Sequence, residues 1–423
     1  MPIPTLRSFA TYLSLIALVA CSTDDGNDAA GTPDSSVGVD SSLDGSRSDA
    51  GCPADCGQDA AAIRDASDSG SSPSDGGTEA GSDGAPPCSP PLIGSVQGAV
   101  GEGSTITIVG SCFGDVGPNV ALFEDFELGT AGSAVSTTPG SARIGHWTGT
   151  NGSGLTTYTT QWAHGGSMAE QNNWDTPDPE PGNQMSLAFP STHAVFVSHW
   201  VMIPFGKCIP GSATCGNPIG PNWKMCWIFN SPFGNPHTDD YVTEAIIQNS
   251  LGTGYTQWGF SNTSGIIRAF ESNDRMSYGQ WSRSDWYQKA GVGNGRLQGW
   301  ITNATAGHVQ ALDQTGTTLE AGYSWNELTI PGYGRGQTPN GLTLYDDIYV
   351  ATGAGARARV EIGDAPTYAS CTNLAISTAS SWTGGAIHAT VRLGSFQSGD
   401  PVYVYVIDPD GNVNAAGYPA TVQ

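Results

Sequence analysis

The sequence has few charged side chains, and very few of them are basic. Only 13% of its residues are charged, with 15 Lys and Arg against 39 Asp and Glu, and the formal net charge is −24. A chain this acidic repels polyanions, so we expect no nucleic-acid partner. The sequence also lacks an apolar run of about 18 residues, so we expect no membrane-spanning helix in the mature chain.

Several motifs that carry chemistry are also missing. There is no phosphate-binding loop and no Gly-x-Ser-x-Gly elbow, and the seven histidines lie far apart. The spacing Cys-x-x-x-Cys occurs once, with no histidine at ligand spacing, so we expect no metal site and no cofactor. Asp408-Pro-Asp410-Gly-Asn412 has the opening of a calcium loop without its distal Glu, and a β-turn between strands explains it better.

The first residues carry an export signal. Residues 9–20 form an apolar run that is too short to span a bilayer, and the run ends in Leu18-Val19-Ala20-Cys21. This ending resembles the lipobox of bacterial lipoproteins. The resemblance implies a signal peptide at 1–20, a lipid on Cys21 and an exported protein anchored to the outer membrane or cell surface. A plain secretory signal with a chance cysteine is the alternative.

A low-complexity segment follows, and we expect residues 21–87 to be a disordered acidic linker. From residue 22 to 87 there is no Trp, Phe or Tyr, and fourteen acids face two arginines, a net charge of −12. Such a stretch cannot bury enough apolar surface to offset the entropy of ordering it. The membrane is then contacted only through the lipid, and we expect the folded part to be a monomer.

Cysteine usage fits an oxidising compartment. Eight cysteines remain after Cys21, an even number that suggests disulfides. The candidate pairs are Cys208 with Cys215, across a Pro/Gly turn, and Cys52 with Cys56. The sequence leaves open how the remaining four pair: Cys88, Cys112, Cys226 and Cys371.

The region from residue 88 onwards shows strand patterns. Short apolar runs alternate with period two and are separated by Gly, Asn, Asp or Pro, as in Thr105–Val109 and Ala194–Ile203. No apolar periodicity near 3.6 persists, so we expect an all-β fold. About 336 residues are too many for one sandwich, so we expect two domains.

The two ends of this region match one domain type. Ile93, Val96, Gly98, Ile106 and Phe113 fall in the pattern P-I-x-x-V-x-G … I-x-I-x-G-x-x-F-G, which resembles the opening of IPT/TIG domains, small immunoglobulin-like sandwiches. The pattern stops after Leu122, and strands with a suitable ending return from residue 373 to 423. We therefore expect a split immunoglobulin-like domain at 88–123 plus 365–423.

The intervening residues 124–364 resemble another superfamily. The flanks ALFEDFEL (121–128) and YDDIYVATGAGARARVEIGD (345–364) are similar to paired strands of concanavalin A-like jelly rolls. That superfamily contains lectins, glycoside hydrolases and polysaccharide lyases. The fold expectation is thus an immunoglobulin-like sandwich with an inserted concanavalin A-like jelly roll, preceded by a disordered tether.

Aromatic residues point to a glycan partner. Eleven of the twelve Trp lie in the insert, and sugar rings stack on aromatic faces while their hydroxyls bind planar polar groups. Strand parity predicts a concave glycan-binding cluster of six side chains: Lys224, Glu244, Gln248, Arg296, Gln298 and Trp300. The alternative is that the tryptophans fill the core and the polar residues form a solvated outer face.

The sequence features that point to catalysis are weaker than those that point to glycan binding. Tyr287-Gln-Lys289-Ala-Gly resembles part of a jelly-roll alginate lyase motif, but the motif's second Tyr is Gly293 here and its companion motifs are missing. His199 is a further weak candidate, and its apolar strand neighbours favour a packed histidine. The glucanase signature E-x-D-x-x-E is absent.

These observations favour a surface-displayed lipoprotein that binds a polysaccharide. They lean against an enzyme but leave open whether any catalysis occurs. A polysaccharide lyase acting on uronate-containing glycans is the alternative. A second alternative is a non-catalytic adhesive or spacer lipoprotein, because immunoglobulin-like modules often hold other domains apart.

Overall fold

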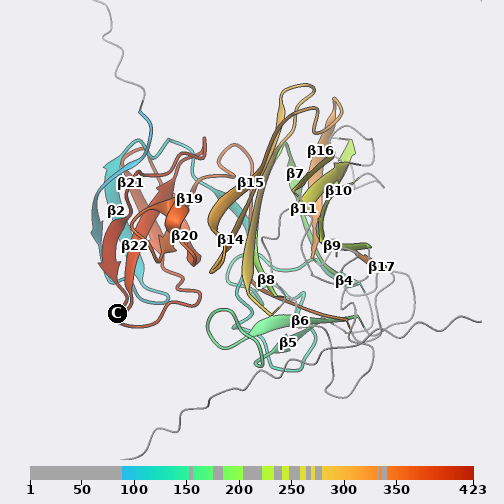
Figure 1. Ribbon diagram of the computed structural model, residues 1–423, viewed down its shortest axis with the longest axis horizontal. Helices are drawn as coiled ribbons and strands as arrows, with labels where there is room; N and C mark the ends of the chain where they lie inside the picture. Colours follow the sequence, from blue (N-terminus) through green and yellow to red (C-terminus); the bar gives the residue numbers. More distant parts are fainter. Residues whose placement is uncertain are drawn as a thin grey trace, which may run out of the picture. The chain divides into compact units, whose positions relative to one another are not determined.

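The computed structural model describes residues 88–151, 156–174, 184–202, 222–232, 241–246, 258–262, 268–271, 279–330, 333–335 and 341–423. These residues form β-strands almost throughout, with one short 3-10 helix, η1 (Tyr368–Ser370), and no α-helix among them. The predicted all-β fold is therefore confirmed (Figure 1). None of the helical segments within these ranges is long and apolar enough to cross a membrane. Cys21, the linker and the candidate disulfides Cys52–Cys56 and Cys208–Cys215 lie outside the described residues.

Strands from both ends of the described chain join in one seven-stranded sheet. We call this part of the molecule the small sandwich. Its order is β1-β2-β21-β20-β19-β22-β23. The parallel bridge Val100–Val422 links the segment after β1 to the segment after β23. The strands are β1 (Leu92–Gln97), β2 (Thr105–Ser111), β19 (Arg359–Gly363), β20 (Leu374–Trp382), β21 (Ala386–Thr390), β22 (Pro401–Ile407) and β23 (Tyr418–Thr421).

Alternation in β2 explains why the two ends meet. Ile106 and Ile108 are fully buried, whereas Val109 is 40% exposed. The buried side chains join a core that includes Val391 and Val404 from the far end of the sequence. Burying apolar area of this kind is the main stabilising contribution to folding.

Two chemical details complete the small sandwich. A disulfide joins Cys88 to Cys112, with an S–S distance of 2.04 Å, and so fastens the segment before β1 to the end of β2. The turn at Asp408 is closed by hydrogen bonds from the Gly411 N–H to the Asp408 carbonyl and from the Asn412 N–H to the Asp408 carboxylate. The β-turn interpretation of this segment is therefore confirmed.

β19 differs from the sequence interpretation. The predicted insert extended to residue 364, but β19 pairs with both β20 and β22 in the small sandwich. Its residues Val360 and Ile362 belong to the core of that sandwich. The alternating pattern of 359–363 fits either sheet equally well, so period alone could not assign the strand.

The intervening strands form two eight-stranded sheets, which together we call the large sandwich. One sheet has the order β12-β11-β10-β9-β16-β7-β4, with β17 beside β9, and the other has the order β15-β14-β13-β8-β18-β6-β5, with β3 beside β18. The first comprises β4 (Gly149–Asn151), β7 (Gln184–Thr192), β9 (Asn222–Pro232), β10 (Tyr241–Ile246), β11 (Trp258–Asn262), β12 (Arg268–Glu271), β16 (Tyr323–Ile330) and β17 (Tyr333–Arg335). The second comprises β3 (Asn119–Glu124), β5 (Thr156–Thr159), β6 (Ala169–Trp174), β8 (Ala194–Met202), β13 (Ser282–Lys289), β14 (Gly295–Asn303), β15 (Gly307–Gly316) and β18 (Gly341–Thr352).

The second sheet is buried on both faces along β8 and β13. Val195, Val197 and Trp286 enter the core between the two sheets. On the opposite face, which we call the outer face, Phe196 and Tyr287 join a cluster that includes Ile376 of the small sandwich. Every described residue of β8 is buried, as expected for a central strand covered on both sides.

A buried ionic network holds β13 and β19 together. Arg283 donates two hydrogen bonds to the Glu361 carboxylate, at 2.8 and 3.1 Å, and a third to Asp285 at 2.8 Å. Arg359 binds the same Glu361 carboxylate, and the Tyr368 hydroxyl donates to it at 3.0 Å. Burial alone would raise the pKa of Glu361, but Arg283 and Arg359 lower it to about 2.

Candidate functional site

The structure places five of the six predicted glycan-binding residues, and these five lie in two sheets. Lys224 lies in β9 and Glu244 in β10, whereas Arg296, Gln298 and Trp300 share β14 in the other sheet. These five residues therefore do not share one sheet face. Parity fixes which residues of a strand lie together, but it cannot tell which sheet a strand joins. Gln248 lies outside the described residues, and whether any of the six contacts a glycan stays a prediction.

The three β14 residues do lie on one face, as predicted by parity. Their neighbours Leu297 and Ile301 enter the core of the large sandwich, so Arg296, Gln298 and Trp300 are on the outer face. Trp300 is partly buried and packs against the outer-face cluster. This leaves part of its ring accessible next to two polar side chains.

β15 adds a carboxylate to which these polar groups bind. Asp313 receives two hydrogen bonds from Arg296, from Nε at 2.7 Å and from Nη2 at 2.6 Å. Gln298 and Gln310 donate to the same carboxylate at 3.3 and 3.4 Å. Because Arg296 and Asp313 are both partly exposed, at 44% and 38%, we expect this pair to orient side chains rather than to stabilise the fold strongly. We call the set the outer-face platform, comprising Arg296, Gln298, Trp300, Gln310 and Asp313.

One acceptor on the platform is unsatisfied. Gln298 is 5% exposed, and its Oε1 has no hydrogen-bond partner among the described residues. A buried acceptor without a partner costs about 1–3 kcal/mol. The oxygen is enclosed, so a ligand on the open part of the platform does not reach it in this arrangement.

Tyr287 lies beside Gln298 on β13 and carries a second polar group to the platform. The two residues are directly paired across the strands, and the Arg357 guanidinium lies 5.0 Å from the centroid of the Tyr287 ring. Burial raises the pKa of Tyr287 and Asp410 adds to the effect, while Arg357 and Arg296 oppose it. At neutral pH the Tyr287 hydroxyl is therefore protonated and can donate a hydrogen bond.

The other two weak catalytic candidates lie elsewhere. Lys289 is exposed at the end of β13. His199 is fully buried on the inner face of its sheet, with its ring centroid 5.5 Å from that of Tyr345. The structure does not bring His199 and Tyr287 to the same face.

Sequence reasoning missed Asp313, Gln310 and Arg357. Residues 307–316 mix apolar and polar positions, and a register shift opposite Gly299 and Trp300 breaks their alternation. The two-residue alternation therefore did not identify residues 307–316 as a strand. Arg357 precedes β19 and reaches the platform only because β19 belongs to the small sandwich.

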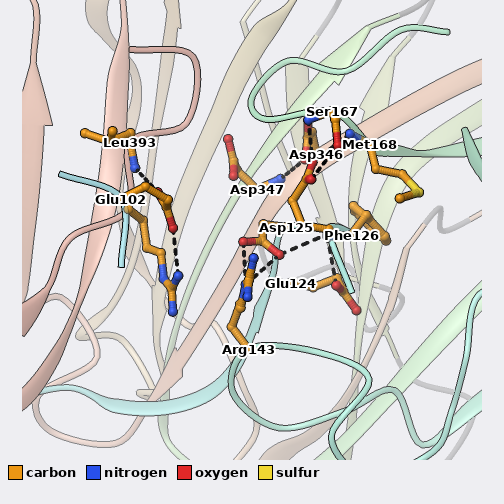
Figure 2. A network of polar contacts seen from close by, with 12 residues as sticks. Glu102, Glu124, Asp125, Phe126, Arg143, Ser167, Met168, Asp346, Asp347 and Leu393 are labelled. Carbon is orange, nitrogen blue, oxygen red and sulfur yellow. Dashed lines mark hydrogen bonds and ion pairs between the residues drawn. The ribbon is translucent and has the colours of Figure 1, made fainter. Parts of the chain in front are cut away.

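A second polar surface lies where residues of the two sandwiches meet (Figure 2). It is a cleft of about 280 Å³, lined by charged side chains that include Glu102, Asp125, Glu127, Asp347 and Arg392. All four carboxylates have partners. Asp125 accepts from Arg143, Glu102 from Arg392 and the Leu393 N–H, Glu127 from Ser167 and the Met168 N–H, and Asp347 bonds to His164. The cleft is thus mainly a structural junction.

Within this junction, His164, Asp346 and Asp347 offer ligand atoms that all lie within 4.8 Å of one another. The Asp346 carboxylate already accepts three backbone N–H groups, from His164, Gly165 and Asp347. These bonds account for the burial of Asp346 without a metal ion. That the protein binds no metal stays a prediction.

Glu124 lies beside Asp125, near the same junction. It is fully buried, and its Oε1 accepts the Phe126 N–H at 2.9 Å. Burial raises the pKa of Glu124 to about 8, with a further contribution from Asp125, against the opposing effects of the Phe126 N–H and Arg143. Glu124 is therefore mostly protonated at neutral pH.

Comparisons with known proteins give structural similarity only. No protein-family model matches the chain, and no curated protein sequence matches it. Among solved structures, the alginate lyase Aly36B is 14% identical, with a TM-score of 0.39, over 56% of this chain and 97% of that one. The cellulose-induced protein Cip1 is 10% identical (TM-score 0.34; 55% and 97% covered). A GH131 β-glucanase catalytic domain from Podospora anserina is also 10% identical (TM-score 0.33; 56% and 96% covered).

Proposed function

We propose that the protein binds carbohydrate on the outer-face platform. The observation that carries the proposal is the partly exposed Trp300 on the same face as the partly exposed ion pair of Arg296 and Asp313. A sugar ring presents both a C–H face, which stacks on an indole, and hydroxyl groups, which donate and accept hydrogen bonds. The platform offers a partner for each.

The polar groups of the platform can act without rearrangement. Arg296 is already held in a fixed orientation by its two bonds to Asp313, so it loses little freedom when it donates a further bond. Asp313, which is 38% exposed, can accept from a hydroxyl. This combination of fixed donors and acceptors around an aromatic ring supports sugar binding over a purely adhesive or spacer role.

The largest loss of binding is expected from Trp300→Ala. Removal of the indole deletes the stacking surface, and we expect affinity for a bound oligosaccharide to fall about 5- to 150-fold. Isothermal titration with plant and algal oligosaccharides measures this. Trp162→Ala is the matched control, because Trp162 is 39% exposed and contributes nothing to the platform. Equal affinity of the Trp300→Ala variant and the wild type would rule out the platform as the binding site.

A polysaccharide lyase is the second candidate, because Tyr287 is paired with Gln298 and its ring is covered by the Arg357 guanidinium. A lyase needs a group that removes a proton next to the uronate carboxylate. The raised pKa of Tyr287 suits an acid better than a base, so we place binding first. Incubation with polyuronates distinguishes a lyase from a binding protein. Cleavage by β-elimination creates an ultraviolet-absorbing unsaturated uronate, and binding alone does not.

We also propose that the protein is exported and anchored by a lipid on Cys21, with residues 88–423 displayed on the acidic linker. The support is the segment Leu18-Val19-Ala20-Cys21 and the composition of residues 22–87. Cys21→Ser should move the protein from the detergent phase to the aqueous phase in Triton X-114 partitioning, or leave its precursor uncleaved. Unchanged partitioning would contradict the lipid anchor.

A further inference from the structure

The platform is closed at one end of its strands. Thr302 is the next outer-face residue of β14 after Trp300, and it is fully buried. Its hydroxyl lies 2.7 Å from His308 Nδ1, and the His308 ring lies 4.5 Å from the Tyr368 ring of η1. Tyr368 is in turn held by Glu361. A ligand lying along β14 and β15 therefore meets η1 directly beyond Trp300.

The platform is also closed across its strands. Beyond Gln298 the next outer-face residue is Tyr287, which is 9% exposed. Arg357 covers its ring, and Arg357 is packed so closely against Gly411 that a Cβ at that glycine would overlap the guanidinium. On the following strand Arg359 covers the Phe196 ring at 4.3 Å. The rest of the outer face along β13 and β8 is therefore not accessible.

None of the described residues covers the remaining two sides. β15 is the edge strand of its sheet, and Gln310 and Asp313 on it are exposed. Arg296 is 44% exposed at the end of the platform away from η1. A ligand can thus approach over β15 or past Arg296, but it cannot continue across the sheet.

On the basis of the proposed function, we infer that the platform binds the terminal sugar of a glycan chain and not an internal segment. An internal sugar of an extended chain needs open space on two opposite sides. A sugar stacked on Trp300 has open space only on two adjacent sides, toward Arg296 and over β15, because η1 and Tyr287 lie opposite them. The small sandwich, through η1 and the Arg357–Gly411 contact, would therefore determine specificity as well as hold the fold together.

The test compares short oligosaccharides of cellulose, laminarin, xylan and polygalacturonate with their parent polymers at equal mass concentration. For any glycan that binds, we expect the half-saturating mass concentration to rise in proportion to chain length, because each chain has one recognised end whatever its length. Trp300→Ala should weaken the binding of both forms equally. Biolayer interferometry with the immobilised chain covering residues 22–423 gives both quantities.

Each outcome has a distinct meaning. Half-saturation at the same mass concentration for oligomer and polymer would show that internal sugars bind, which overturns this inference and leaves the proposed function standing. If Trp300→Ala does not weaken binding, the platform is not the binding site, which overturns both the proposed binding site and the inference about chain ends. A complete lack of binding across the panel would overturn the proposed function, and the inference with it.

Discussion

Replacement of Glu361 by Ala should destabilise the protein by about 3–5 kcal/mol. The carboxylate is fully buried and binds Arg283 and Arg359, which are 1% and 7% exposed. Its removal leaves two buried guanidinium groups close together without their shared counter-charge. The midpoint of urea unfolding of the chain covering residues 88–423 measures the loss.

The matched control for this substitution is Glu102→Gln. Glu102 also forms an ion pair with an arginine, Arg392, but it is 49% exposed. Water screens such a pair, so its loss should cost about 1 kcal/mol or less. Equal effects of the two substitutions would contradict a stabilising role for the buried network.

The same network should make the free energy of unfolding depend on pH in the acidic range. The pKa of Glu361 is about 2 in the folded chain against an ordinary value of 4.5. Its contribution is therefore present above pH 4.5 and is lost as pH falls toward 2, because only the unfolded chain is protonated easily in that interval. In the Glu361→Ala variant this part of the acid dependence should be absent.

Glu124→Gln should have the second large effect, with the opposite dependence on pH. The pKa of Glu124 is about 8 in the folded chain, against 4.5 ordinarily. The folded chain keeps a proton on Glu124 that the unfolded chain releases. The contribution of Glu124 to the free energy of unfolding is therefore fully present below pH 4.5 and is lost as pH rises through 8. Between pH 4.5 and pH 7 the loss amounts to about 3 kcal/mol.

Gln resembles the protonated Glu, so the variant should lack this loss. We expect similar unfolding midpoints for the variant and the wild type at pH 4.5, and a variant that is more stable by about 3 kcal/mol at pH 7. Glu320→Gln, which removes an exposed carboxylate, serves as the control. A difference between Glu124→Gln and the wild type that stays constant with pH would show that Glu124 is ionised in the folded state.

The local parts of the fold could be predicted from the sequence. The alternation in 105–109 predicted a strand, in which Ile106 and Ile108 are buried, and parity in 296–300 placed Arg296, Gln298 and Trp300 on one face. Both follow from the two-residue period of a strand, which depends only on neighbours along the chain.

The parts that depend on pairing between distant segments could not be predicted. Arg283 and Glu361 are 78 residues apart, and nothing in either segment indicates the other. The register shift that brings Asp313 to Arg296 and the left-handed backbone of Asp347 are likewise set by tertiary contacts. For this reason the five described residues of the predicted site lie in two sheets, and the covering of the outer face was not predicted.

The central claim is that a glycan stacks on Trp300 of the outer-face platform. Its most direct test is a nitrogen-15 NMR titration of the tryptophan indole N–H signals of the folded chain with a bound oligosaccharide, the Trp300 signal being identified by its loss in Trp300→Phe. We predict that this signal shifts progressively and saturates with the ligand. Saturable shifts confined to other tryptophans, with Trp300 unchanged, would contradict the claim.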